Sequence, residues 1–172
     1  STCDLIFEDC VVPKENLLGK EGQGFKIAMQ TLDGGRIGIA AQALGIAEGA
    51  MEESINFAKT REQFGRPIAK FQAIAFMIAE MATKLEAAKN LVYKTAWLID
   101  NGQDASMAAS MAKFYASEVC NEIAAKTVQI HGGYGFIKDY KIERMFRDCR
   151  VFTIYEGTSQ VQQMVISGKL LK

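Results

Sequence analysis

The stretch FQAIAFMIAEMATKLEAAKNLVYKTAWLID, residues 71–100, decides the fold class of the chain. Its apolar side chains recur every three or four residues, and this spacing brings side chains to one face of an α-helix. At a rise of about 1.5 Å per residue, a helix of this length spans about 45 Å. The stretch therefore predicts one long amphipathic helix.

The same spacing is found on both sides of this stretch. Apolar stripes run through residues 37–58 and 111–123, and a further helix is expected at residues 159–171 with a short one near residues 140–146. The motifs FGRP, NGQD and HGGYG carry glycines, which predict turns between consecutive helices. The expected fold is all-α: an up-down four-helix bundle with a short extra helix.

The first twelve residues follow a different pattern. Cys3, Leu5 and Phe7 alternate with their neighbours ahead of Pro13, which is typical of a β-strand that ends at a proline. A lone strand has no partner for its backbone hydrogen bonds, so this strand-like segment is interpreted as a stray edge or as the last strand of a domain upstream. The glycines of LLGKEGQGF then predict a loop.

Composition excludes several classes of function. The chain has 172 residues, and its 20 Lys and Arg balance its 20 Asp and Glu, so no charge surplus suggests nucleic acid or a membrane surface as a partner. No apolar run reaches the ~20 residues of a membrane helix, which predicts a soluble protein. Four cysteines without paired spacing and a single histidine, His131, indicate neither a zinc site nor a disulfide framework. No metal is expected, and a reducing compartment fits best.

The segment IYEGTSQ, residues 154–160, is the best candidate for chemistry. Glu156 lies between an aromatic residue and a glycine, just ahead of Thr158 and Ser159, either of which could cap the last helix. A carboxylate held among apolar groups and bound substrate is poorly solvated and can act as a base near neutral pH. The competing interpretation is a helix-entry glutamate that interacts only with the helix dipole, and composition alone favours it.

Four segments together resemble those of the acyl-CoA dehydrogenase family, in the same order and spacing. They are LDGGRIGIAAQALGIA (32–47), TREQFGRPIAKFQ (60–72), QIHGGYGF (129–136) and IYEGTSQVQ (154–162). The resemblance covers essentially the whole chain and is to the C-terminal domain of the short-chain, butyryl-CoA dehydrogenase-like kind. It implies an FAD-dependent flavoprotein of fatty acid metabolism, a homotetramer that oxidises short-chain acyl-CoA to trans-2-enoyl-CoA.

The resemblance implies that Glu156 is the catalytic base, which removes the α-proton of the thioester while the β-hydrogen leaves as hydride to the flavin. Some relatives carry this glutamate one residue before the arginine of the LDGGR segment, where this chain has Gly35. The residues that match acyl-CoA contacts are Asp33, Gly34, Gly35, Arg36, Tyr155 and Gly157. For Asp33 and Arg36, an ion pair at the start of a helix is an equally weighted alternative.

A second set matches FAD contacts, mainly to the pyrophosphate and adenosine of a flavin held by the neighbouring subunit. It consists of Arg61, Gln72, Gln129, Ile130, His131, Gly132, Gly133, Thr158, Ser159 and Gln160. Arg61 suits a phosphate, although a solvated arginine at a helix end is the ordinary alternative. Because the mechanism needs no histidine, His131 is interpreted as incidental to the chemistry. Tyr93, Trp97 and the methionines lie on helical stripes and are interpreted as core.

The resemblance also divides the chain. Residues 1–23 are expected to be the last strand and exit loop of a β-domain that this sequence does not include, and residues 24–172 the helical-bundle domain. The isolated chain is therefore expected to be inactive. The expected electron partner is an electron-transfer flavoprotein, in the cytoplasm of a bacterium or the mitochondrial matrix of a eukaryote. The alternatives are an acyl-CoA oxidase-like relative and a helical bundle that serves only oligomerisation.

Overall fold

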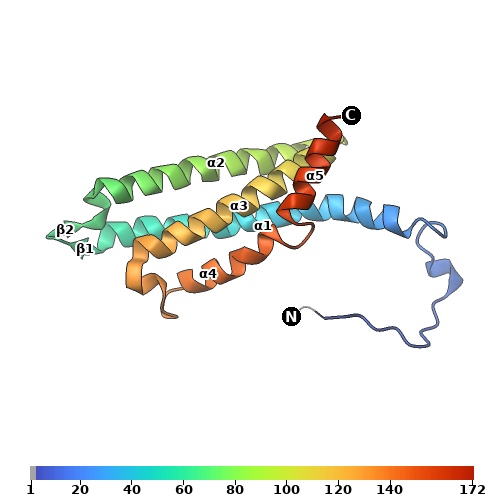
Figure 1. Cartoon of the computed structure of the whole chain (residues 1–172), viewed down its shortest axis with the longest axis horizontal. Coiled ribbons are helices and arrows are strands. Elements are labelled where there is room, and N and C mark those ends of the chain that lie inside the picture. Colours follow the sequence, from blue (N-terminus) through green and yellow to red (C-terminus); the bar gives the residue numbers. More distant parts are fainter. Residues whose placement is uncertain (1–2) are drawn as a thin grey trace. The chain divides into compact units, whose positions relative to one another are not determined.

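The structure is a computed structural model that describes residues 3–172, and most of these residues are helical (Figure 1). Its helices are α1 (Gly24–Thr60), α2 (Gln72–Asp100), α3 (Ser106–His131), α4 (Ile142–Cys149) and α5 (Ser159–Leu170). Two-residue strands β1 (Glu62–Gln63) and β2 (Arg66–Pro67) pair antiparallel between α1 and α2. Short 3-10 helices cover Lys14–Asn16, Ile68–Lys70, Gly132–Gly135 and Arg150–Thr153. The all-α prediction is confirmed.

The chain divides into two compact units that meet in sequence between Thr31 and Leu32. In the first unit, residues 3–12 form no strand, and Leu5, Phe7 and Val11 are 83%, 76% and 94% exposed. These residues pair with no other strand among the described residues, so their backbone hydrogen bonds have no partner here. That they are the last strand of an upstream β-domain stays a prediction. The first two residues of the predicted strand lie outside the described residues. The predicted domain boundary after residue 23 stays a prediction.

Helix α1 begins earlier than the apolar stripe at residues 37–58 indicates. Its first residue is Gly24, directly after a loop in which Gly19 and Gly22 take φ values of +77° and +81°. Asp33 and Arg36 therefore lie inside α1, and the alternative of an ion pair at a helix start is wrong in its placement. Glycines are weak helix formers, so the three in the segment LDGGRIG conceal the helical character of this stretch.

In the second unit α2 and α3 run antiparallel beside the part of α1 that follows residue 31, as Figure 1 shows. The α1 side of the core consists largely of alanines, with Ala40, Ala43, Ala47 and Ala50 at most 1% exposed. Such small side chains let helices approach closely. Across this seam Ser54 Oγ donates a hydrogen bond of 2.9 Å to Thr127 Oγ1, which joins α1 to α3.

The apolar stripe of α2 is confirmed, and two of its aromatic neighbours are not core. Met81, Ala88 and Val92 are buried, whereas Tyr93 and Trp97 are 63% and 57% exposed. Each of these aromatics directly follows a stripe residue and is rotated from it by about 100° around the helix. The interpretation of both as core is therefore wrong.

Ion pairs fasten α2 to α3 at the surface. Lys84 Nζ lies 2.6 Å from Glu122 Oε1, and Lys126 Nζ lies 2.6 Å from Glu80 Oε2. Hydrogen bonds from Lys126 and Lys84 lower the pKa of Glu80 to about 2.

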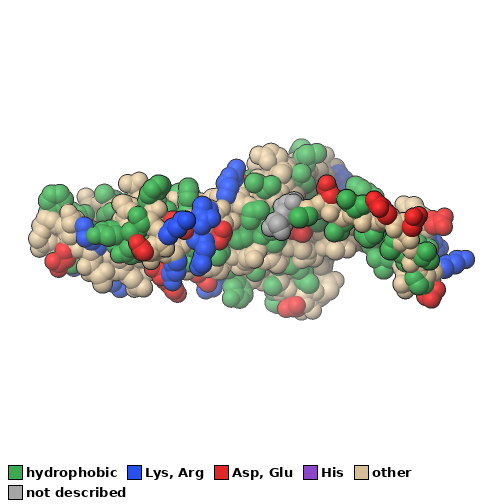
Figure 2. Space-filling model, turned by 90° about the horizontal axis from the view of Figure 1, so that it is seen from below, with side chains coloured by type: hydrophobic (Ala, Val, Ile, Leu, Met, Phe, Trp, Pro, Cys, Tyr) green, Lys and Arg blue, Asp and Glu red, His purple; other side chains and the backbone are tan. Residues whose placement is uncertain are grey.

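A different face carries Lys and Arg side chains that gather over α4 (Figure 2). Within residues 3–172 the structure has no helix with the length and apolar character needed to cross a membrane.

Candidate active site

Glu156 lies in a tight turn between the 3-10 helix Arg150–Thr153 and α5. The turn is left-handed, with φ values of +55° for Glu156 and +89° for Gly157. Its side chain reaches the second unit's part of α1: a Cβ atom built on Gly35 would lie 3.0 Å from Cδ of Glu156 and closer still to Oε2. The carboxylate therefore packs directly on the bare backbone of Gly35, and a side chain at that position would displace the carboxylate.

The environment of this carboxylate is unusual. Oε2 of Glu156 is buried and has no hydrogen-bond partner among the described residues. A buried carboxylate oxygen without a donor is costly, so sites of this kind are commonly found where a ligand or a reacting group completes the set. Oε2 of Glu156 is therefore available as a proton acceptor.

The support of the turn comes from α3 and α5. Thr158 Oγ1 accepts the backbone N–H of Val161 at 3.3 Å and so caps α5. Gln162 Nε2 donates to the carbonyl oxygens of Glu156 and Gly157, at 3.1 Å and 3.0 Å. Lys113 Nζ donates to the carbonyl oxygen of Gly157 at 2.7 Å. Both carbonyl oxygens of the turn thus accept hydrogen bonds from side chains of α3 or α5.

Lys113 and Gln162 were not singled out by the sequence reasoning. Both are completely buried. Burial lowers the pKa of the Lys113 ammonium group below its usual value, while the Glu118 and Glu156 carboxylates act in the opposite direction. The signal that could have found Lys113 is its spacing, because it follows Ala109 by four residues and precedes Ala116 by three on the buried face of α3.

Arg36 and Tyr155 border this region. Arg36 is 5% exposed and donates to Asp33 Oδ1 at 2.5 Å and to Ser110 Oγ at 3.4 Å. It therefore joins α1 to α3, a structural role that coexists with any contact to acyl-CoA. Tyr155 donates from its hydroxyl to Gln42 Oε1 at 2.6 Å, a second link between the turn and α1.

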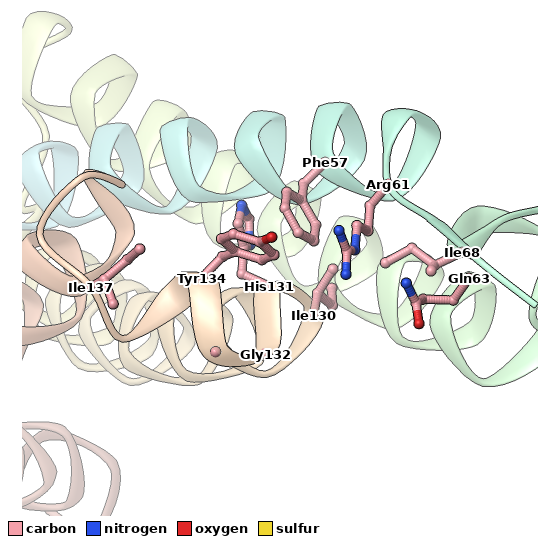
Figure 3. Close-up of a pocket in the computed structure, with 10 residues that line it drawn as sticks. Phe57, Arg61, Gln63, Ile68, Ile130, His131, Gly132, Tyr134 and Ile137 are labelled. Carbon is pink, nitrogen blue, oxygen red and sulfur yellow. The ribbon is translucent and has the colours of Figure 1, made fainter.

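The predicted FAD contacts fall into two groups. One group surrounds a cavity of about 430 Å³ at the other end of α1 and α3 (Figure 3), and it contains Arg61, Ile130, His131, Gly132 and Gly133. The other group, Thr158, Ser159 and Gln160, lies at the start of α5. Ser159 Oγ donates to Glu118 Oε1 at 2.5 Å, and Gln160 is exposed. Neither Gln72 nor Gln129 lines the cavity, and both are exposed.

Within the cavity, the guanidinium of Arg61 lies 5.1 Å from the centre of the Tyr134 ring, and the close-up in Figure 3 shows it projecting between α1 and the end of α3. His131 is turned inward: its Nδ1 lies 2.8 Å from the carbonyl oxygen of Thr127, and its ring stacks on Phe57 at 4.1 Å. Gly132 has a φ of +57° and exposes its backbone. These features suit an anionic ligand with an aromatic or apolar portion.

A known protein family matches the chain. The family model described as "Acyl-CoA dehydrogenase, C-terminal domain" matches residues 22–171. The chain belongs to the acyl-CoA dehydrogenase family. This match confirms the resemblance that the four sequence segments of this acyl-CoA dehydrogenase domain indicate.

Relatives of this acyl-CoA dehydrogenase domain are similar over essentially its whole length. It is 70% identical over 172 residues to a subunit of the caffeyl-CoA reductase–Etf complex of Acetobacterium woodii, and 58% identical over 171 residues to the 3-(aryl)acrylate reductase of Clostridium sporogenes. The solved butyryl-CoA dehydrogenase of Megasphaera elsdenii matches with a TM-score of 0.96 and 51% identity, over 97% of this chain and 44% of that one. The chain spans 45% of the length of each of the two curated relatives.

Proposed function

We propose that this domain supplies the general base of a flavin-dependent acyl-CoA dehydrogenase, and that the base is Glu156. The observation that carries the proposal is the buried, unpartnered Oε2 atom of Glu156, which rests on Gly35. Because this buried oxygen has no donor beside it, it is free to accept a proton from a bound substrate. In the proposed reaction the proton leaves the α-carbon of an acyl-CoA thioester.

The neighbouring residues have proposed roles in holding the substrate. Among the described residues no acceptor is found for the backbone N–H of Glu156, so this donor is available to the thioester carbonyl, whose developing negative charge it would stabilise. The space beside Gly35 holds the Glu156 carboxylate, and Gly34 lines a separate cavity at the turn between α2 and α3. Contacts of Gly34, Gly35, Tyr155 and Gly157 with the acyl-CoA stay proposals. Asp33 and Arg36 are proposed to border the acyl-CoA while they pair with each other.

The proposed cofactor is FAD, which accepts the β-hydrogen as hydride when it is bound. The cavity around Arg61 fits part of this group, because it combines a guanidinium, exposed glycine backbone and the apolar side chains of Phe57 and Ile130. Arg61 is proposed to hold a phosphate, and Gly132 and Gly133 to let the ligand approach the backbone. The further FAD contacts predicted from the sequence, at Gln72, Gln129, Ile130, His131, Thr158, Ser159 and Gln160, stay proposals.

A second candidate is the reverse reaction, the reduction of an aryl-substituted 2-enoyl-CoA. It is favoured by the 70% identity to the subunit of the caffeyl-CoA reductase–Etf complex. In this direction the reduced flavin, when bound, would supply the hydride that adds to the β-carbon of the substrate, and Glu156 would begin protonated and donate the proton that adds to the α-carbon. Both candidates use the same residue, and they differ in the preferred direction and in the group that occupies the acyl site.

The proposed assembly follows from the family. The full-length protein is proposed to be a homotetramer that exchanges electrons with an electron-transfer flavoprotein, in the cytoplasm if its source is bacterial and in the mitochondrial matrix if its source is eukaryotic. A bundle that served only oligomerisation would gain nothing from a buried carboxylate oxygen that has no hydrogen-bond partner. An acyl-CoA oxidase-like protein would be recognised by rapid reoxidation of its reduced flavin in air.

The test compares the full-length FAD-loaded protein with its Glu156→Gln variant. Butyryl-CoA is mixed with each under anaerobic conditions, and the bleaching of the flavin is followed. Glutamine keeps the shape but accepts no proton, so we expect a loss of about 10²–10⁴-fold in rate with acyl-CoA binding retained. The matched control is Glu86→Gln on the exposed face of α2. A Glu156→Gln rate within a few-fold of wild type would overturn the proposal.

The same preparation distinguishes the two directions. The flavin is first reduced, and its reoxidation by crotonyl-CoA and by caffeyl-CoA is compared under anaerobic conditions. Faster reoxidation by caffeyl-CoA supports the aryl-enoyl-CoA candidate, and the opposite order supports the short-chain candidate. Loss of both reactions in Glu156→Gln would assign the proton transfer of each to the same carboxylate.

A further inference from the structure

Lys113 is the largest side chain that is completely buried among the residues the structure describes. Its ammonium group forms no ion pair with any described residue, and its single hydrogen bond is to the carbonyl oxygen of Gly157, at 2.7 Å. A buried charge that forms no direct ion pair is expensive, and an apolar side chain of similar size would fill the same space at no such cost. The lysine therefore requires a reason beyond packing.

The carbonyl that Lys113 holds belongs to the turn with the unusual backbone. Glu156 and Gly157 have φ values of +55° and +89°, and the first of these is strained because Glu156 carries a Cβ atom. Gln162 Nε2 donates to both carbonyls of the turn from the opposite element, α5. Three hydrogen bonds from two completely buried side chains thus converge on two consecutive carbonyls.

We infer that Lys113 and Gln162 are positioning residues: by holding these carbonyls they keep Glu156 in its left-handed conformation and so direct its carboxylate onto Gly35. The inference rests on the proposed function, in which Glu156 is the base. A strained backbone persists only when its surroundings hold it, and without the two donors the turn would relax toward a more common conformation. The carboxylate would then move away from the place where the substrate is bound.

The test uses the full-length FAD-loaded protein and butyryl-CoA. Lys113→Met keeps the length and apolar stem of the side chain but removes the donor and the charge. A displacement of about 1 Å at a reacting group can cost on the order of 10²-fold in rate, so we expect the limiting rate of anaerobic flavin reduction to fall about 10–100-fold. The FAD content and the dissociation constant of butyryl-CoA are expected to stay within about threefold of wild type.

The matched control is Lys126→Met, the same substitution on the same helix. Lys126 pairs with Glu80 and Glu122 at the surface, so its loss should leave the limiting rate unchanged. A further variant combines Lys113→Met with Glu156→Gln. Because a positioning residue acts only through the group it positions, the added Lys113→Met should cause little further loss in that background.

The outcomes separate a positioning role from a purely structural one. If Lys113→Met lowers the melting temperature while the rate per bound flavin stays within about threefold of wild type, the lysine only supports the fold and the inference is wrong. If Lys113→Met does not fold, Gln162→Met is judged by the same two measurements. If Glu156→Gln keeps the wild-type rate of flavin reduction, the proposed function is wrong. If Glu156→Gln loses that rate while Lys113→Met and Gln162→Met keep it, only the positioning inference is wrong.

Discussion

The carboxylate of Glu156 occupies the space that a side chain at Gly35 would need. A Cβ atom on Gly35 would lie 3.0 Å from Cδ of Glu156 and closer to Oε2, so the two positions share one place between α1 and the turn before α5. Resemblance to the family implies that relatives carry the base at either of these positions. The structure gives a steric reason why only one of the two can be occupied.

Gly35→Ala is therefore expected to displace the carboxylate without harming the helix. Alanine favours a helix by about 1 kcal/mol over glycine, so stability should be equal or higher, whereas the rate of anaerobic flavin reduction by butyryl-CoA should fall about 10–100-fold. The control is Gly38→Ala, also in α1, where a Cβ atom meets nothing within 4 Å. A Gly35→Ala enzyme with wild-type rate would contradict the shared-space interpretation.

Moving the base to α1 is expected to need an empty position 156. In the full-length enzyme, Gly35→Glu alone should be poorly active because two side chains compete for one place. The double variant Gly35→Glu with Glu156→Gly frees that place, and glycine also suits the φ of +55° at residue 156. We expect the double variant to reduce its flavin at least about tenfold faster than Glu156→Gly alone. Equal rates for the two would show that a carboxylate on α1 does not reach the substrate.

Arg61→Ala is expected to weaken FAD retention in the full-length enzyme. Loss of a charge-assisted hydrogen bond costs about 1.5–3 kcal/mol, which raises the dissociation constant of FAD about 10–100-fold, while saturating FAD should recover most of the turnover. Arg66→Ala provides the control, because Arg66 lies on the nearby hairpin but stacks at 4.4 Å on Phe71 and does not line the cavity. Equilibrium titration with FAD measures both, and an unchanged constant for Arg61→Ala would remove it from the cofactor site.

The ion pairs between α2 and α3 predict a pH dependence of stability. Hydrogen bonds from Lys126 and then Lys84 lower the pKa of Glu80 from 4.5 to about 2 in the folded chain. A lowered folded-state value means that the contribution is fully present above the unfolded value and is lost as the pH falls from about 4.5 to about 2. Because Glu80 is exposed, the effect should be small.

Urea unfolding of the 172-residue chain and of its Glu80→Gln variant measures this contribution. We expect the two midpoints to differ near neutral pH and to converge as the pH approaches the folded value of about 2. Glu52→Gln, an exposed change on α1 away from these lysines, is the control. A difference between wild type and Glu80→Gln that persists unchanged down to that pH would assign the effect to something other than ionisation of this carboxylate.

Much of the fold could be predicted because its helices carry regular apolar stripes. The helix expected at residues 71–100 is found as Gln72–Asp100, and the helix expected at residues 159–171 is found as Ser159–Leu170. The start of α1 could not be predicted, because glycines and polar residues hide its helical character. The lack of a strand partner for residues 3–12 could be predicted, because alternation in a single segment supplies no second strand.

The candidate site was predictable to a different degree at each residue. The motif singles out Glu156, but its contact with Gly35 depends on how α1 packs, which the sequence does not show. The role of Lys113 could not be predicted from sequence patterns, because lysine is normally a surface residue and only the structure shows this one completely buried. Matching motifs also did not show whether Gln72 and Gln129 line the cavity, because this depends on how the helices pack.

The alanines that line α1 have an entropic consequence for the site. Ala40, Ala43 and Ala47 are buried against neighbouring helices, and an alanine has no rotamers to lose when it is packed. These alanines are therefore packed at little cost in side-chain freedom. Because Gly35 lies on the same helix, this packing also fixes the backbone on which the Glu156 carboxylate rests.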